Sequence, residues 1–179
     1  MRKFNTILTA VIMVLFLIHA ILGSFQMLGA GNTVAKWLSW ISAGLVGVHL
    51  IIGVKLTADT FRAQKRSGSA YFRQNLLFWS RRISGFVVMV LLLFHFTAFG
   101  YYAGDAYRLR WFDTGRLITQ ILLVLSLAVH IISNVRPMMI AMGIRSLKEW
   151  IGDILFVLSV ILLLAAAGFI VYYIRWNAV

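Results

Sequence analysis

The chemistry open to this sequence begins with its four histidines, His19, His49, His95 and His130, each of which lies in a different long apolar segment. A neutral imidazole is a common metal ligand, but inside a bilayer it is costly and needs a partner. Four imidazoles in four separate membrane segments indicate a buried cofactor with paired axial ligands. Haem, bound twice, is the cofactor that best fits such pairs.

Other metal donors are scarce. The sequence has no cysteine, which excludes disulfides, thiolate metal sites and iron–sulfur ligation. No carboxylate lies in the middle of an apolar run, since Asp153 is near the start of the last one, so a zinc or non-haem iron site would lack ligands. Bis-histidine ligation is therefore favoured over methionine ligation, because several methionines lie where they are typical of packing: Met13, Met89, Met138 and Met139.

Five long apolar runs must position the histidines. Of the 179 residues, 61% are hydrophobic and 12% charged, and the mean hydropathy of +0.90 exceeds what a soluble core needs. Each run can cross about 30 Å of hydrocarbon. The first run is too long for a signal-peptide core and is expected to stay in the mature protein. We predict an all-α integral membrane protein with one domain, 1–179, and five transmembrane helices at 4–29, 34–54, 83–103, 117–135 and 151–174.

The basic residues predict the orientation of these spans. Lysine and arginine in short loops stay on the cytoplasmic side. Twelve of the 17 basic residues lie before span one, between spans two and three, or between spans four and five. The N-terminus is therefore predicted inside and the C-terminus outside, in a multi-pass protein of the cell's inner (cytoplasmic) membrane. The net charge of +12 fits this bias and attraction to anionic lipid or an acidic partner, and not nucleic-acid binding.

The depths of the histidines, counted from the nearest inner charge, fall into two pairs. His49 and His130 are each six residues from that charge, which places them about 9 Å from the inner boundary. His95 is thirteen residues from it and His19 sixteen, which places both roughly 20 to 24 Å away. We therefore predict an outer haem between His19 and His95 and an inner haem between His49 and His130, at levels roughly 11 to 15 Å apart.

This arrangement contains a weak internal repeat. An outer histidine is followed by an inner one in spans one and two, and again in spans three and four, at intervals of 30 and 35 residues. The last span has no histidine. We predict a four-helix haem-binding core with the fifth helix peripheral to it.

Local sequence at the third span adds a resemblance. Trp79, Ser84, Gly85 and Phe86 lie around the start of this span, and His95 follows in its middle. Together with one histidine in each of the first four spans and none in the fifth, this pattern resembles the di-haem cytochrome b membrane-anchor subunits of the succinate dehydrogenase and fumarate reductase (succinate:quinone oxidoreductase) family. The likeness covers the whole chain in architecture and a smaller part of it in motif.

The resemblance implies a role in electron transfer. It implies two haem b groups, quinone as substrate, and an iron–sulfur subunit and a flavoprotein subunit as partners on the cytoplasmic side. The chain has no flavin fingerprint and no dicarboxylate site of its own, so chemistry on succinate or fumarate would belong to the partners. The basic segment 55–82 would then dock the iron–sulfur subunit, although the charge bias of a cytoplasmic loop explains it equally well.

The resemblance also implies polar contacts to the haem propionates. For the inner haem we expect cationic and polar partners near the inner helix ends; each arginine also has a simpler role as an interfacial anchor. Small residues at Gly44, Gly47 and Gly85 would let a porphyrin approach the backbone, or would serve helix packing. The expected propionate partners are Trp79, Arg81, Arg82, Ser84 and Arg136.

A quinone site is expected on the outer side, where the family has an acidic residue near its second helix. This sequence departs from that pattern, because the loop 29–36 has no carboxylate and no glutamate precedes His130 within the membrane. No coupled proton pathway is therefore carried over. The substitutes, each equally well explained as a solvated loop residue, are Gln26, Asn32, Tyr101, Asp105 and Asp113.

Two alternatives remain from the sequence. One is a cytochrome b of another respiratory complex, of the formate dehydrogenase or hydrogenase type, in which two ligands usually share one helix. The other is a haem-free polytopic membrane protein, such as a small transporter or assembly factor, whose histidines form hydrogen bonds between helices.

Overall fold

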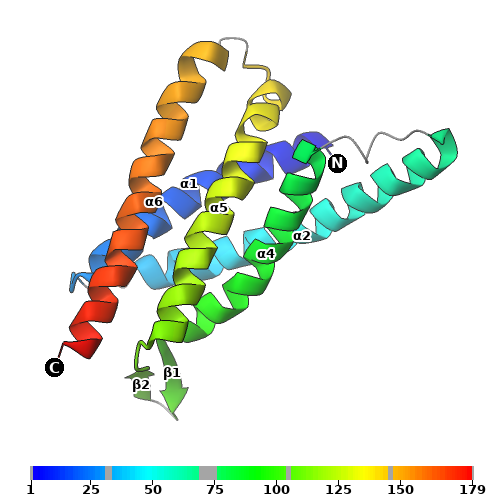
Figure 1. The fold of residues 1–179 in the computed structure, drawn as a ribbon. Helices are drawn as coiled ribbons and strands as arrows, with labels where there is room; N and C mark the ends of the chain where they lie inside the picture. The colour runs from blue at the N-terminus through cyan, green and yellow to red at the C-terminus, as the bar shows by residue number, and fades with distance from the viewer. Residues whose placement is uncertain (1, 31–33, 69–75, 104–105, 145–146, 179) are drawn as a thin grey trace.

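The computed structural model describes residues 2–30, 34–68, 76–103, 106–144 and 147–178. Its elements are shown in Figure 1. Five of its helices are long and apolar enough to cross a membrane, so the five predicted spans are confirmed. In chain order the elements are α1 (Arg2–Met27), α2 (Val34–Ser67), α4 (Leu76–Ala98), β1 (Gly100–Ala103), β2 (Ala106–Leu109), α5 (Thr114–Ala141) and α6 (Leu147–Asn177).

The second helix is longer than predicted. The predicted span stopped at residue 54, where charges begin, but α2 continues to Ser67. Charged residues end an apolar run without ending a helix, and neither glycine nor proline occurs between Lys55 and Ser67. The helix is followed by Gly68, whose φ of 64° is the left-handed conformation typical after a helix C-terminus. The result is a basic helical extension beyond the membrane span.

The third span was placed too far along the chain. Helix α4 begins at Leu76 and ends at Ala98, and the residues predicted to complete the span form strand β1 instead. Strand β1 pairs antiparallel with β2, with Gly100 opposite Leu109 and Ala103 opposite Ala106. The consecutive tyrosines of β1 favour an extended conformation. The chain is therefore not purely helical, since a short hairpin precedes α5.

Helix α5 passes through the only proline of the chain. The predicted span ended at residue 135, but the helix continues through Pro137 to Ala141. Proline lacks the N–H that would bond the carbonyl four residues earlier, which is that of Ser133. The Arg81 Nε–H donates to this carbonyl at 2.8 Å instead. A neighbouring helix thus satisfies the group that the proline leaves free, as membrane proteins require.

The helices form two hairpins that α6 connects. Helix α1 packs along α2, α4 along α5, and α6 along both α5 and α1. In Figure 1 the α1–α2 hairpin crosses the layer of α4, α5 and α6, and the termini lie at opposite ends. In the most apolar stretch of α6, 33% of the residues are buried, whereas the corresponding stretch of α2 has none. The histidine-free helix, predicted to be peripheral, therefore carries much of the packing between the hairpins, whereas the residues of that stretch of α2 are at most partly buried.

Aromatic side chains link α2 to α4 near the two ends of these helices. Trp40 stacks on Phe96 with ring centroids 6.5 Å apart. Toward the other end, Phe61 contacts Phe78 with ring centroids 6.1 Å apart and Trp79 with centroids 6.4 Å apart. Between these contacts, a Cβ added at Gly44, Gly47 or Gly53 would meet no atom within 4 Å. The middle of α2 thus leaves space beside it.

The orientation can be tested with reporter fusions. We expect alkaline phosphatase to be active when fused after Asn177 and inactive when fused after Ser67, because basic residues in short loops favour the cytoplasmic side. Green fluorescent protein fused at the same positions should give the opposite pattern. Phosphatase activity after Ser67 would contradict the orientation.

Candidate cofactor site

The two histidines paired on the outer level lie together in space. His19 of α1 and His95 of α4 have ring centroids 6.1 Å apart and ring planes at 82° to one another. Two imidazoles on opposite sides of one metal ion, each bound at about 2.0 Å, have centroids about 6 Å apart. The separation of these rings therefore has the size that a shared metal ion between them requires.

Each hairpin is tied internally by reciprocal histidine hydrogen bonds. In the first hairpin, His19 Nδ1 lies 3.0 Å from Ser39 Oγ, and His49 Nδ1 lies 3.1 Å from Asn5 Oδ1. Helix α1 therefore orients the histidine of α2, and α2 orients the histidine of α1.

The second hairpin repeats this plan. His95 Nδ1 lies 2.7 Å from Gln120 Oε1, and His130 Nδ1 lies 3.2 Å from Ser84 Oγ. Ser39 and Gln120 each precede by ten residues the histidine of their own helix. The internal repeat expected from the histidine order thus extends to the residues that hold the rings.

For His49, His95 and His130, the identity of the partner assigns a proton to Nδ1 and leaves Nε2 available. The side-chain oxygens of Gln120 and Asn5 can only accept, so His95 and His49 donate through Nδ1–H. The hydroxyl of Ser84 is directed to the carbonyl of Arg81 at 3.4 Å, so it too accepts from its histidine, His130. Among the described residues, the hydrogen bonds of all four rings run through Nδ1. A histidine held through Nδ1–H offers the lone pair of Nε2 to a metal.

The predicted inner level is formed by His49 of α2 and His130 of α5, whose Nδ1 atoms lie beside Asn5 and Ser84. Beside the His130 ring lies Gly85, where an added Cβ would be 3.0 Å from Cε1 and 3.2 Å from Nδ1. Gly85 therefore makes room for the histidine ring itself. Of the two roles expected for this glycine, contact with a porphyrin or helix packing, the structure supports packing.

The residues expected near the inner haem propionates lie in different settings. Arg81 donates to the Ser133 carbonyl, and Ser84 holds His130. Trp79 contacts Phe61 and Phe78 and is 40% exposed, and Arg136 is exposed. Of this set, Arg81 and Ser84 are joined to α5, whereas Trp79 and Arg136 lie away from the rings' hydrogen bonds.

Arg82 has the feature expected of an anion-binding residue. Its guanidinium carbon lies 5.2 Å from the centroid of the Phe78 ring. Its Nε is buried and has no hydrogen-bond partner among the described residues. A buried, unpaired donor of a charged group is costly. A carboxylate of a bound group, such as a haem propionate, would remove that cost, so the residues present fit haem at the inner level.

The expected outer quinone residues mostly have other roles or cannot be described. Asp113 is the N-cap of α5: it accepts from the Arg116 N–H at 2.8 Å and pairs with the Arg116 guanidinium at 2.5 Å. Gln26 is exposed near the end of α1. Asn32 and Asp105 lie outside the described residues, and so does the side chain of Tyr101. Asp113 is therefore explained by helix capping.

Sequence reasoning missed the residues that hold the histidine rings: Asn5, Thr9, Ser39 and Gln120. The sequence does contain a signal for them, since each is a polar residue within or beside an apolar run. Gln120 is fully buried, and a buried polar side chain needs a partner. Which ring it meets depends on the rotation of one helix against another, and apolar periodicity does not give that.

Within the described residues, no group of three or more histidine, cysteine, aspartate or glutamate side chains is placed to hold a metal ion. The candidate metal ligands are instead the paired histidines.

Comparisons with protein-family models, with curated proteins and with solved structures find no match to this chain. The site is therefore interpreted from its own geometry.

The contact between Gly85 and His130 gives a direct test of the site. We expect Gly85→Ala to push the ring from its bond with Ser84 and to destabilise the protein by about 1–3 kcal/mol, the usual effect of overpacking. Gly53→Ala is the matched control, because nothing lies within 4 Å of its added Cβ. Thermal unfolding in detergent measures both. Equal midpoints for Gly85→Ala and wild type would contradict the contact.

Proposed function

We propose that this chain is the di-haem b membrane subunit of a respiratory complex of the succinate dehydrogenase or fumarate reductase type. It transfers electrons between the quinone pool and a cytoplasmic iron–sulfur and flavoprotein pair. The observation that carries this proposal is the outer pair, His19 and His95, whose rings are 6.1 Å apart and are each held through Nδ1. Bound haem would supply one-electron iron chemistry.

The protein's own contribution is orientation and exclusion of water. His19 and His95 come from different hairpins, so one shared group would join the two hairpins across the space that α2 leaves free. The inner pair, His49 and His130, has the same hydrogen-bonded tautomer, and the α4 helix that holds His130 also carries Arg82, whose Nε is buried. A ligand ring fixed by a second hydrogen bond is more basic and better oriented than a free one.

The extension of α2 supports a cytoplasmic partner. Residues 55–67 form a helix that carries Lys55, Arg62, Lys65 and Arg66 against one acidic residue, Asp59. Aromatic contacts from Phe61 fix this extension against the start of α4. A rigid, basic surface is suited to an acidic protein partner, for which charge complementarity speeds and orients association.

A haem-free membrane protein is the second candidate, and one observation favours it. All four Nδ1 atoms already have partners within their own hairpin, so the histidines could serve only as interhelical ties. The two candidate functions differ in the role of Nε2. An interhelical hydrogen bond through Nδ1 leaves Nε2 without a role, whereas an iron ligand binds the metal through Nε2.

Single histidine substitutions separate the two candidates. We expect His19→Ala and His95→Ala to remove the same haem, and His49→Ala and His130→Ala to remove the other, because an axial ligand pair is lost when either member is lost. The pyridine haemochrome assay on purified protein should fall from two haems per chain to one, and redox titration should show which haem remains.

Each pair of variants is the control for the other, with helical content checked by circular dichroism. Equal loss of both haems from every folded single variant would overturn the pairing. Wild-type protein without haem, made with ample haem supply, would support the haem-free candidate.

A further inference from the structure

Gln120 differs from the other residues that hold the histidine rings. Its side chain is fully buried, and its Oε1 lies only 2.7 Å from Nδ1 of His95. The other ring hydrogen bonds among the described residues are longer, from 3.0 to 3.4 Å. A hydrogen bond shielded from water is electrostatically stronger than one in water. Of the four rings, that of His95 is therefore the most strongly bonded.

A short chain of hydrogen bonds fixes the direction of the Gln120 amide. The Thr119 hydroxyl donates to the carbonyl of Arg116 at 2.8 Å, so its oxygen is left to accept from the Gln120 Nε2–H at 3.4 Å. The amide nitrogen therefore points to the hydroxyl and the amide oxygen to the imidazole, which must donate through Nδ1–H. Ser39 gives no such assignment for His19, because a hydroxyl both donates and accepts.

Aromatic side chains fix the plane of the His95 ring. Phe99 meets this ring edge to face with centroids 5.6 Å apart, and Phe96 meets it at a tilt with centroids 6.4 Å apart. Phe99 is itself stacked on Phe112, which is fully buried. A ring that is bonded at Nδ1 and bordered by packed aromatic rings has little freedom to turn.

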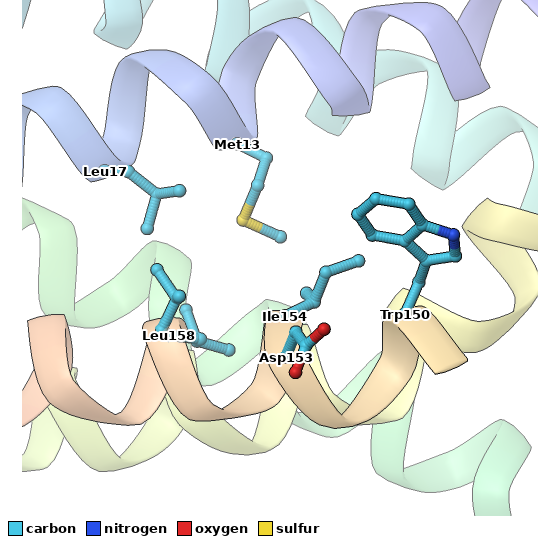
Figure 2. Close-up of a pocket in the computed structure, with 7 residues that line it drawn as sticks. Met13, Leu17, Trp150, Asp153, Ile154 and Leu158 are labelled. Carbon is cyan, nitrogen blue, oxygen red and sulfur yellow. The ribbon is translucent and has the colours of Figure 1, made fainter. Parts of the chain in front are cut away.

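His19 approaches this fixed ring from a helix whose other side is packed on α6. Met13 and Leu17 of α1 pack against the buried cluster that includes Leu158 of α6. Figure 2 shows these side chains facing each other across an open apolar groove. His19 lies two residues after Leu17, about 200° further around the helix. The packing on α6 thus turns His19 to the opposite side of α1, where it meets His95.

We infer that Gln120 is the positioning residue of the outer site, an inference that rests on the proposed function and concerns the regulation of its outer haem. The amide oxygen draws the Nδ1 proton of His95 toward itself and makes Nε2 a stronger electron donor. A stronger donor favours ferric over ferrous iron, since the ferric ion carries the greater positive charge. Gln120 therefore lowers the reduction potential of the outer haem and, with Phe99, holds the His95 ring nearly perpendicular to that of His19.

Redox titration of the purified full chain in detergent, followed by visible absorbance, tests this role. We expect Gln120→Leu, which removes the acceptor at similar volume, to shift the potential of one haem upward and to leave the other unchanged. Gln120→Glu keeps an oxygen acceptor in place and should hold the potential at or below the wild-type value. Ser24→Ala is the matched control, because the buried Ser24 hydroxyl donates to the carbonyl of Ala20 and not to a ring.

Electron paramagnetic resonance of the same proteins reports the ring plane. The highly anisotropic low-spin signal should weaken in Gln120→Leu, because the His95 ring is freed to turn, and should persist in Gln120→Glu and Ser24→Ala. An unchanged potential and signal in Gln120→Leu would overturn the inference. Equal upward shifts in Gln120→Leu and Gln120→Glu would overturn it as well, because they would indicate lost packing and not a lost acceptor.

A measurement on the wild-type chain covers the case in which Gln120→Leu does not fold. Solid-state nuclear magnetic resonance of reduced protein labelled with ¹⁵N-histidine and ¹³C-glutamine should show a protonated Nδ1 coupled to a glutamine side chain. Absence of this coupling would overturn the inference. Haem with the same potential in wild type and Gln120→Leu would sink the inference and leave the proposed function standing, whereas a chain that shows the coupling but binds no haem would sink the proposed function.

Discussion

The structure depends on one constraint: a polar imidazole placed inside an apolar helix must find a hydrogen-bond partner. Each of the four histidines meets it within its own hairpin, through a Ser, Asn or Gln side chain of the neighbouring helix. In lipid such bonds hold helices together, since polar groups there have few other partners. For His49, His95 and His130 they also fix which ring nitrogen carries the proton. The same bonds thus stabilise the hairpins and prepare Nε2 for a ligand.

The rest of the architecture follows from how these hairpins are joined. Helix α6 packs on α1 and α5, and aromatic contacts link α2 with α4 near their ends. These contacts leave space along the middle of α2, while His19 and His95 approach each other from the two hairpins. The arrangement suits a group that lies between hairpins and is bound from both sides. Pro137 contributes as well, because the carbonyl that it frees anchors Arg81.

Much of the fold was readable from the sequence, because the cost of burying charge in hydrocarbon acts residue by residue. The five spans and the grouping of His19 with His95 came from hydropathy and counting. Helix ends were harder: α2 passes Lys55 because charge does not break a helix, and β1 replaces the end of the third span. The partners Ser39 and Gln120 could not be assigned, since they depend on how one helix is rotated against another. Asp113 shows the reverse case: an Asp before a helix start is a capping signal, whereas from the sequence we expected only a substitute quinone contact or a solvated loop residue.

The central claim, that the paired imidazoles hold haem, is tested most directly on the purified wild-type chain. Electron paramagnetic resonance of the oxidised protein should show two low-spin ferric haems for each polypeptide. Because the rings of His19 and His95 are 82° apart, one of them should give the highly anisotropic signal of perpendicular imidazole planes. Folded protein that lacks low-spin haem after expression with ample haem supply would contradict the account.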